Sequence, residues 1–104
     1  MHAQPPREAR QTLRRRMIEL LMEGEMTDRD LSQALGIREK EVYFHLSHVA
    51  RSLGPGKRRL RVTPVRCLKC GYVFRNRKRL TRPSRCPECK GTHLERPSFR
   101  IEAE

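Results

Sequence analysis

Four cysteines are the residues of this chain best suited to chemistry. They form two close pairs, Cys67 with Cys70 and Cys86 with Cys89, and fifteen residues separate the pairs. Two thiolates three positions apart can point at one ion, and two such turns facing each other supply the tetrahedral sulfur cage that zinc accepts. We therefore expect one structural Zn ion bound by all four cysteines, with no coordination position left for water or substrate.

Other interpretations fit the cysteine pattern less well. Ordinary buried thiols rarely fall into two close pairs, and a redox-active CxxC motif usually accompanies a βαβ pattern, which the sequence lacks. His93, four residues after Cys89, is a candidate substitute ligand. Iron is a less favoured occupant than zinc, because a net charge of +12 does not suit an electron carrier of the rubredoxin kind.

Composition and charge point to a small basic protein with an anionic partner. The 104 residues are 36% hydrophobic and include no Trp, so the core is modest and a metal would help to hold it together. Residues 1–56 carry nine Lys and Arg against eight Asp and Glu, whereas residues 57–104 carry fifteen against four. The C-terminal half stays strongly basic even with the negative zinc cage included, and such a field attracts polyanions.

The sequence also bears on location and on catalysis. No stretch approaches the roughly 20 apolar residues of a membrane span, and the N-terminus lacks the apolar run of a secretory signal. We expect a cytoplasmic protein with no membrane partner, where reduced thiols favour metal binding over disulfides. No paired carboxylates, nucleophile and base, or phosphate-binding loop is present, so no enzyme activity is expected.

Three amphipathic helices are predicted in the N-terminal half. Apolar residues recur at helical spacing over residues 7–23, 28–35 and 38–53. Thr27 has the position of an N-cap for the second helix, with Asp30 completing a capping box, and Gly36 can adopt the left-handed conformation that ends it. A turn of about three residues between the second and third helices is typical of a helix-turn-helix.

The C-terminal half shows a different periodicity. Short strands are predicted at Leu60 to Val65, with one basic face, at Tyr72 to Phe74 and at Ser98 to Ile101, and a polar, basic loop is predicted at residues 75–85. The expected fold class is α+β, with a three-helix, winged helix-turn-helix domain at residues 1–56. Residues 57–104 are expected to form the strands of the wing and a four-cysteine zinc ribbon at about residues 66–94, inserted in or following the wing.

The candidates for nucleic-acid binding lie on the outer face of the third helix, on the basic strand and in the basic loop. They are Lys40, Tyr43, Phe44, Ser47, His48, Arg51, Arg59, Arg61, Arg75, Arg77, Lys78 and Arg79. Cations, a hydroxyl, an imidazole and an aromatic ring suit phosphates and base edges. Taken singly, each polar residue of the helix face fits a solvated surface better, but Phe44 needs a partner there. Tyr43 lies at the border of this face, and His45 is expected at the edge of the core.

These features resemble the small predicted transcriptional regulators of archaea and bacteria in which a winged helix-turn-helix is fused to a rubredoxin-like zinc ribbon. The resemblance extends from about residue 10 to residue 102, and the motifs that carry it are Thr27–Leu31, Gly36–Ile37, Val42–Leu46, Cys67–Tyr72 and Cys86–Cys89. It implies that the ribbon is set into the wing, so that the strand near residues 60–65 pairs with the strand near residues 98–102. The second cysteine turn departs from the rubredoxin pattern, because Lys90 stands where a glycine is usual.

Two functions follow as hypotheses. The first is a DNA-binding transcriptional regulator in which the third helix enters the major groove and the ribbon contacts phosphates of duplex DNA. The alternative is an adaptor without operator specificity that binds RNA or a protein partner through the same basic ribbon. The sequence does not predict the operator, the signal or the oligomeric state.

Overall fold

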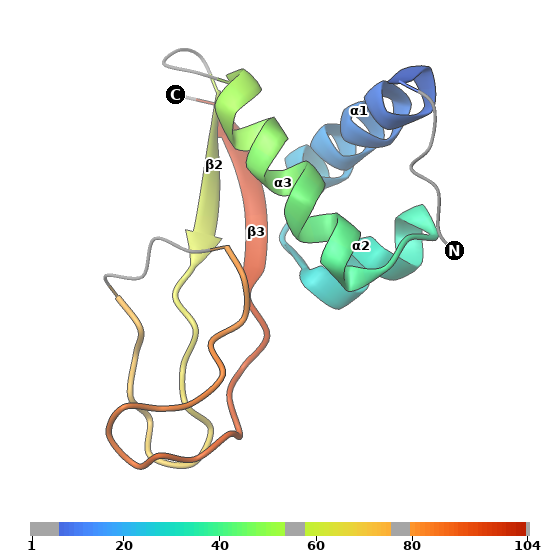
Figure 1. Ribbon diagram of the computed structural model, residues 1–104. Helices are drawn as coiled ribbons and strands as arrows, with labels where there is room; N and C mark the ends of the chain where they lie inside the picture. Colours follow the sequence, from blue (N-terminus) through green and yellow to red (C-terminus); the bar gives the residue numbers. More distant parts are fainter. Residues whose placement is uncertain (1–6, 54–57, 76–79, 104) are drawn as a thin grey trace.

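The computed structural model shows a helical body with a zinc-ribbon lobe extending from one end of its sheet (Figure 1). It describes residues 7–53, 58–75 and 80–103. These residues form three helices and three strands, in the order α1 (Arg7–Glu23), β1 (Met26–Thr27), α2 (Asp28–Leu35), α3 (Glu39–Leu53), β2 (Arg58–Thr63) and β3 (Ser98–Ala103). The predicted α+β class is confirmed.

The helix boundaries follow the predicted signals closely. The Oγ1 atom of Thr27 accepts from the N–H of Asp30 at 3.0 Å, and a carboxylate oxygen of Asp30 accepts from the N–H of Thr27 at 3.0 Å, so the capping box is complete. Gly36 ends α2 with φ 67°, the left-handed conformation. The third helix begins at Glu39, one residue later than predicted.

The capping box of α2 supports a first prediction. Replacing Thr27 with alanine is expected to lower the free energy of unfolding by about 1 kcal/mol, because the N–H of Asp30 loses its acceptor. Chemical denaturation measures the change. Gln33→Ala, at an exposed position of the same helix, should change the free energy by less than about 0.5 kcal/mol. Equal losses in the two variants would contradict a capping role.

The three strands form one antiparallel sheet in the order β1-β3-β2, with β3 in the centre. Leu60 of β2 lies opposite Ile101 of β3, and Thr63 lies opposite Ser98. The predicted pairing of these two distant segments is confirmed. Strand β1, which is two residues long and includes the N-cap of α2, was not predicted.

The helices and the central strand share one hydrophobic core. Phe99 and Ile101 alternate with exposed Arg100 along β3, and they pack among buried residues of the helices, namely Met17, Leu21, Leu31, Leu35, Val42, Leu46 and Val49. A second, smaller cluster lies in the ribbon and consists of Val65, Cys67, Cys86 and Leu94, with Tyr72, Phe74 and Cys89 at its edge. The domain boundary expected between residues 56 and 57 stays a prediction.

Two strand predictions need correction. The strand predicted to reach Val65 ends at Thr63, and Val65 packs in the second, smaller cluster of the ribbon. Tyr72 to Phe74 is not a strand, because its ladder is limited to a single bridge between Val73 and Arg66.

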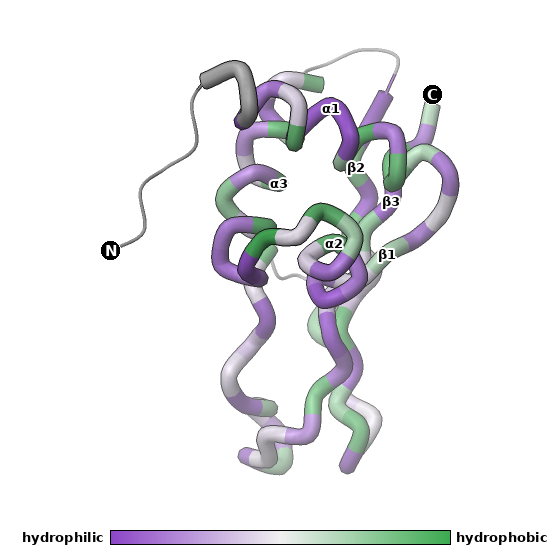
Figure 2. The backbone as a smooth tube through the Cα atoms, turned by 90° about the vertical axis from the view of Figure 1, so that its right-hand side faces the viewer, coloured by the Kyte–Doolittle hydropathy of each residue, from purple (hydrophilic) through white to green (hydrophobic). Residues whose placement is uncertain are grey.

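Hydrophobic residues of the coloured chain fall in short stretches along helices and ribbon alike (Figure 2). None of the described helices is long and apolar enough to span a membrane.

Candidate metal centre and nucleic-acid surface

Two backbone turns of the same form carry the cysteines. In the first, the N–H of Gly71 donates to the carbonyl of Cys67 at 2.9 Å, and in the second, the N–H of Lys90 donates to the carbonyl of Cys86 at 2.9 Å. Gly71 has φ 83° and Lys90 has φ 64°. Lys90 therefore adopts the left-handed conformation that favours glycine, at a cost of about 1 kcal/mol. The departure noted in the sequence leaves the geometry of the turn unchanged.

The four sulfur atoms lie close together between the two turns. All four lie within 4.8 Å of one another, and the pairs Cys67–Cys89 and Cys70–Cys86 are each 3.6 Å apart. A tetrahedral site with Zn–S bonds of about 2.3 Å requires sulfur separations of about 3.8 Å. The donor set therefore fits one structural zinc ion, and the predicted cofactor is confirmed.

His93 is not part of this group. His93 is exposed. Its backbone carbonyl accepts from the N–H of Leu68 at 2.8 Å, and this hydrogen bond helps to hold the first cysteine turn. The group of potential metal ligands found among the described residues comprises the four cysteines.

The pKa shifts of the thiols also favour a bound cation. The backbone N–H of Cys70, followed by that of Lys69, lowers the pKa of the Cys67 thiol to about 6 against the opposing effect of burial. For Cys70, the N–H of Tyr72 lowers the pKa, but lost hydration and the neighbouring thiols, Cys86 foremost, raise it more, to about 12. Four thiolates so close together repel one another, and a divalent metal ion compensates that repulsion.

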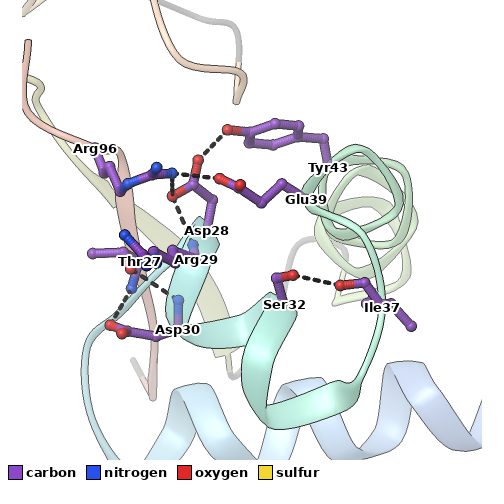
Figure 3. A network of polar contacts seen from close by, with 9 residues as sticks. All are labelled: Thr27, Asp28, Arg29, Asp30, Ser32, Ile37, Glu39, Tyr43 and Arg96. Atoms are coloured by element: carbon purple, nitrogen blue, oxygen red, sulfur yellow. Dashed lines mark hydrogen bonds and ion pairs between the residues drawn. The ribbon is translucent and has the colours of Figure 1, made fainter.

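A buried polar network joins the ribbon exit to the helices (Figure 3). Asp28, at the start of α2, is 0% exposed. Its carboxylate accepts from Arg96 Nη1 at 3.3 Å, from the Tyr43 hydroxyl and from the N–H of Arg29 at 2.7 Å. Arg96 also forms an ion pair with Glu39 at the start of α3. One arginine between the ribbon and β3 thus binds the first turns of both α2 and α3.

This network changes the interpretation of Tyr43. Its hydroxyl donates to the buried Asp28, and burial together with this carboxylate raises the pKa of Tyr43. The hydroxyl therefore already has a partner within the protein, and a contact of Tyr43 with nucleic acid stays a prediction. Helical periodicity places Tyr43 at the border of the outer helix face. In the structure its side chain points toward Asp28, 15 positions earlier in the chain.

The other predicted contacts on α3 lie on its outer face. Lys40, Phe44 and Arg51 are exposed, and Ser47 and His48 are half-buried. The Ser47 hydroxyl donates to the carbonyl of Phe44 at 2.7 Å, within the helix. His45, expected at the core edge, is 3% exposed.

The predicted basic contacts outside α3 are placed less uniformly. Arg59, Arg61 and Arg75 are exposed, and Arg61 pairs with Glu102 at 3.0 Å. Arg77, Lys78 and Arg79 lie outside the described residues. The nucleic-acid role of all these residues stays a prediction.

The contact between Asp28 and Arg96 was missed by sequence reasoning. The two residues are 68 positions apart, so no local pattern links them. The helix dipole is enough to explain an Asp in the first turn of a helix. The sequence therefore gives no separate sign that Asp28 also pairs with Arg96.

Comparisons with known proteins give matches over nearly the whole chain. The model of the PF0610-like N-terminal domain matches residues 12–61, and that of the PF0610 rubredoxin-like zinc beta-ribbon domain matches residues 64–104. The solution NMR structure of protein PF0610 from Pyrococcus furiosus is similar with 32% sequence identity and a TM-score of 0.72, over 100% of this chain and 98% of that one. No significant match was found among curated proteins.

Proposed function

The chain belongs to the PF0610-like family, and from the geometry of its surfaces we propose that it is a DNA-binding transcriptional regulator with a structural zinc ribbon. In this proposal α2 and α3 form a helix-turn-helix, β2 and β3 form its wing, and the ribbon is a rigid basic extension of the wing. The function is non-catalytic and cytoplasmic, and the partner is duplex DNA.

The outer face of α3 carries the proposal. Val42, Leu46 and Val49 anchor the inner face of this helix in the core. Lys40 and Arg51 then project from the opposite face, where they can reach phosphates or base edges. A helix that is fixed on one side and cationic on the other suits the major groove.

Strand β2 and the ribbon add charge beside this helix. Arg58, Arg59 and Arg61 are exposed on the edge strand, which packs against α3. The protein as a whole has a formal net charge of +12. Several phosphate contacts from separate elements would give strong, salt-dependent binding.

Duplex binding as a function of salt tests the proposal. With about six phosphates neutralised, the logarithm of the binding constant should fall against the logarithm of salt concentration with a slope near −5. A genomic DNA pull-down should enrich particular sequences. Binding without a salt slope and without any sequence preference would contradict the proposal.

Exposed Phe44 supports a second candidate function, an adaptor that binds RNA or a protein. This ring is 42% exposed, and aromatic side chains stack on unpaired bases or fill pockets of a partner. Competition between structured RNA and duplex DNA at one salt concentration distinguishes the two functions, since the regulator should prefer the duplex.

A further inference from the structure

A cationic and aromatic cluster lies between α1 and α3, where Arg14, which is not among the predicted contacts, joins three candidate residues of α3. We define the α1–α3 cluster as Arg14 of α1 with Phe44, His48 and Arg51 of α3. The Arg14 Nε–H donates to His45 Nδ1 at 3.3 Å, and the Arg14 guanidinium carbon lies 5.9 Å from the centre of the Phe44 ring. Both contacts fix this arginine against α3.

The inward contacts of Arg14 use one of its five N–H donors. The Nε–H is bound to His45, so the two terminal nitrogens retain four donors. Within the described residues, no carboxylate pairs with Arg14 or Arg51. Donors in a fixed, planar fork with no internal anion match the geometry of a phosphate group.

The exposed ring of Phe44 is held by its neighbours. It meets the His45 ring edge-on at a centroid distance of 5.4 Å and the His48 ring at 4.8 Å. A cation over such a ring gains about 0.5–1 kcal/mol at an exposed site. The contacts with Phe44 and His45 restrict the rotamers of Arg14 before any ligand arrives, and a restricted side chain loses less entropy on binding.

Cations accumulate around His48. Arg51 Nη2 lies 3.4 Å from His48 Nδ1. Partial burial, and then the charges of Arg14, Arg51 and Arg10, lower the pKa of His48. Burial and the charge of Arg14 lower the pKa of the neighbouring His45, and the carboxylate of Glu41 opposes this shift. An approaching phosphate would relieve the repulsion among these arginines.

We propose that Arg14, held over Phe44, contacts a DNA phosphate, so that the α1–α3 cluster extends the DNA-binding surface from the third helix onto the first. The inference rests on the proposed function, since it names a further contact of the same protein with the same partner. Arg14 contributes a charge and a fixed hydrogen-bonding group, without reading base sequence.

The matched variants Arg14→Gln and Arg16→Gln test this role. Each removes one positive charge from α1, and the exposed Arg16 lies about 200° around the helix from Arg14. Fluorescence anisotropy with a labelled duplex, repeated over a series of salt concentrations, gives affinity and salt slope. For R14Q, the slope should become shallower by about 0.9, and the affinity at low salt should fall several-fold. For R16Q, both should stay close to those of the unchanged protein.

Equal slopes and affinities in R14Q and R16Q would overturn the inference. Should R14Q fail to fold, the folded unchanged protein decides the question by NMR. The Arg14 Hε signal should shift on titration with duplex, and an unmoved signal at saturation would overturn the inference.

The two proposals can fail separately. If the unchanged protein binds duplex without a salt slope and without sequence preference, the proposed function itself is contradicted. If it binds as expected and Arg51→Gln weakens binding while R14Q matches R16Q, the surface stops at α3 and the contact from α1 alone is rejected.

Discussion

Replacing Cys86 with serine is expected to abolish stable zinc binding and to unfold the ribbon between Pro64 and Pro97. Cys86 is 0% exposed, and its sulfur is one of the four in the metal site, 3.6 Å from that of Cys70. Structural zinc sites contribute about 10–16 kcal/mol of apparent binding free energy at neutral pH. The second hydrophobic cluster is too small to replace a contribution of that size.

Metal analysis and NMR spectroscopy measure this effect. The zinc content should fall from one ion per chain to well below that value, and the dispersed signals of Val65 and Leu94 should collapse. The helical signal in circular dichroism should largely persist, because the helices have their own core. His93→Gln is the control, since this exposed residue should leave the zinc content unchanged. A serine variant that retains zinc and a folded ribbon would refute the assigned role of Cys86.

A second large effect is expected at the buried carboxylate. Asp28→Ala should lower the free energy of unfolding by about 2–3 kcal/mol, because the partly buried Tyr43 hydroxyl and Arg96 guanidinium each lose a hydrogen-bond acceptor. Arg96 would lose one of its two carboxylates, and the Tyr43 hydroxyl would lose its acceptor. Chemical denaturation followed by circular dichroism measures the loss. The number expresses the cost of stranding these partners, not the net stabilisation by the intact network.

Asp30→Ala is the matched control for this experiment. It removes a carboxylate two positions away in the same helix turn, from an exposed capping residue. The expected loss is about 1 kcal/mol, typical of a lost cap. If Asp28→Ala costs no more than Asp30→Ala, the network around Asp28 does not hold the ribbon exit against the helices.

Local signals explain why much of the fold was predictable from the sequence. Thr27, Asp30 and Gly36 cap α2 through backbone groups within a few residues, so a short stretch of sequence is enough to predict their roles. The cysteine spacing similarly encodes the metal site, because each turn is local and the zinc ion joins the two. The long strands were also found, from their change in periodicity.

Contacts between distant residues explain what the sequence did not reveal. Asp28 finds Arg96 across 68 positions, and Arg14 meets His45 across 31. Helical periodicity placed Tyr43 at a border between two helix faces. It could not show that the Tyr43 hydroxyl donates to the carboxylate of Asp28. Strand β1 exists because β3 lies beside it, since two residues alone carry no strand signal.

The register of the sheet has a consequence for the architecture. Thr63 and Ser98 face each other at the end of the β2–β3 ladder, so residues 64–97 enter and leave the body at neighbouring points. In topological terms they are an enlarged hairpin loop, a position where the chain tolerates exchange of whole modules. Arg96 sets the limit of that freedom, because a shortened or exchanged loop must still supply a cation to Asp28.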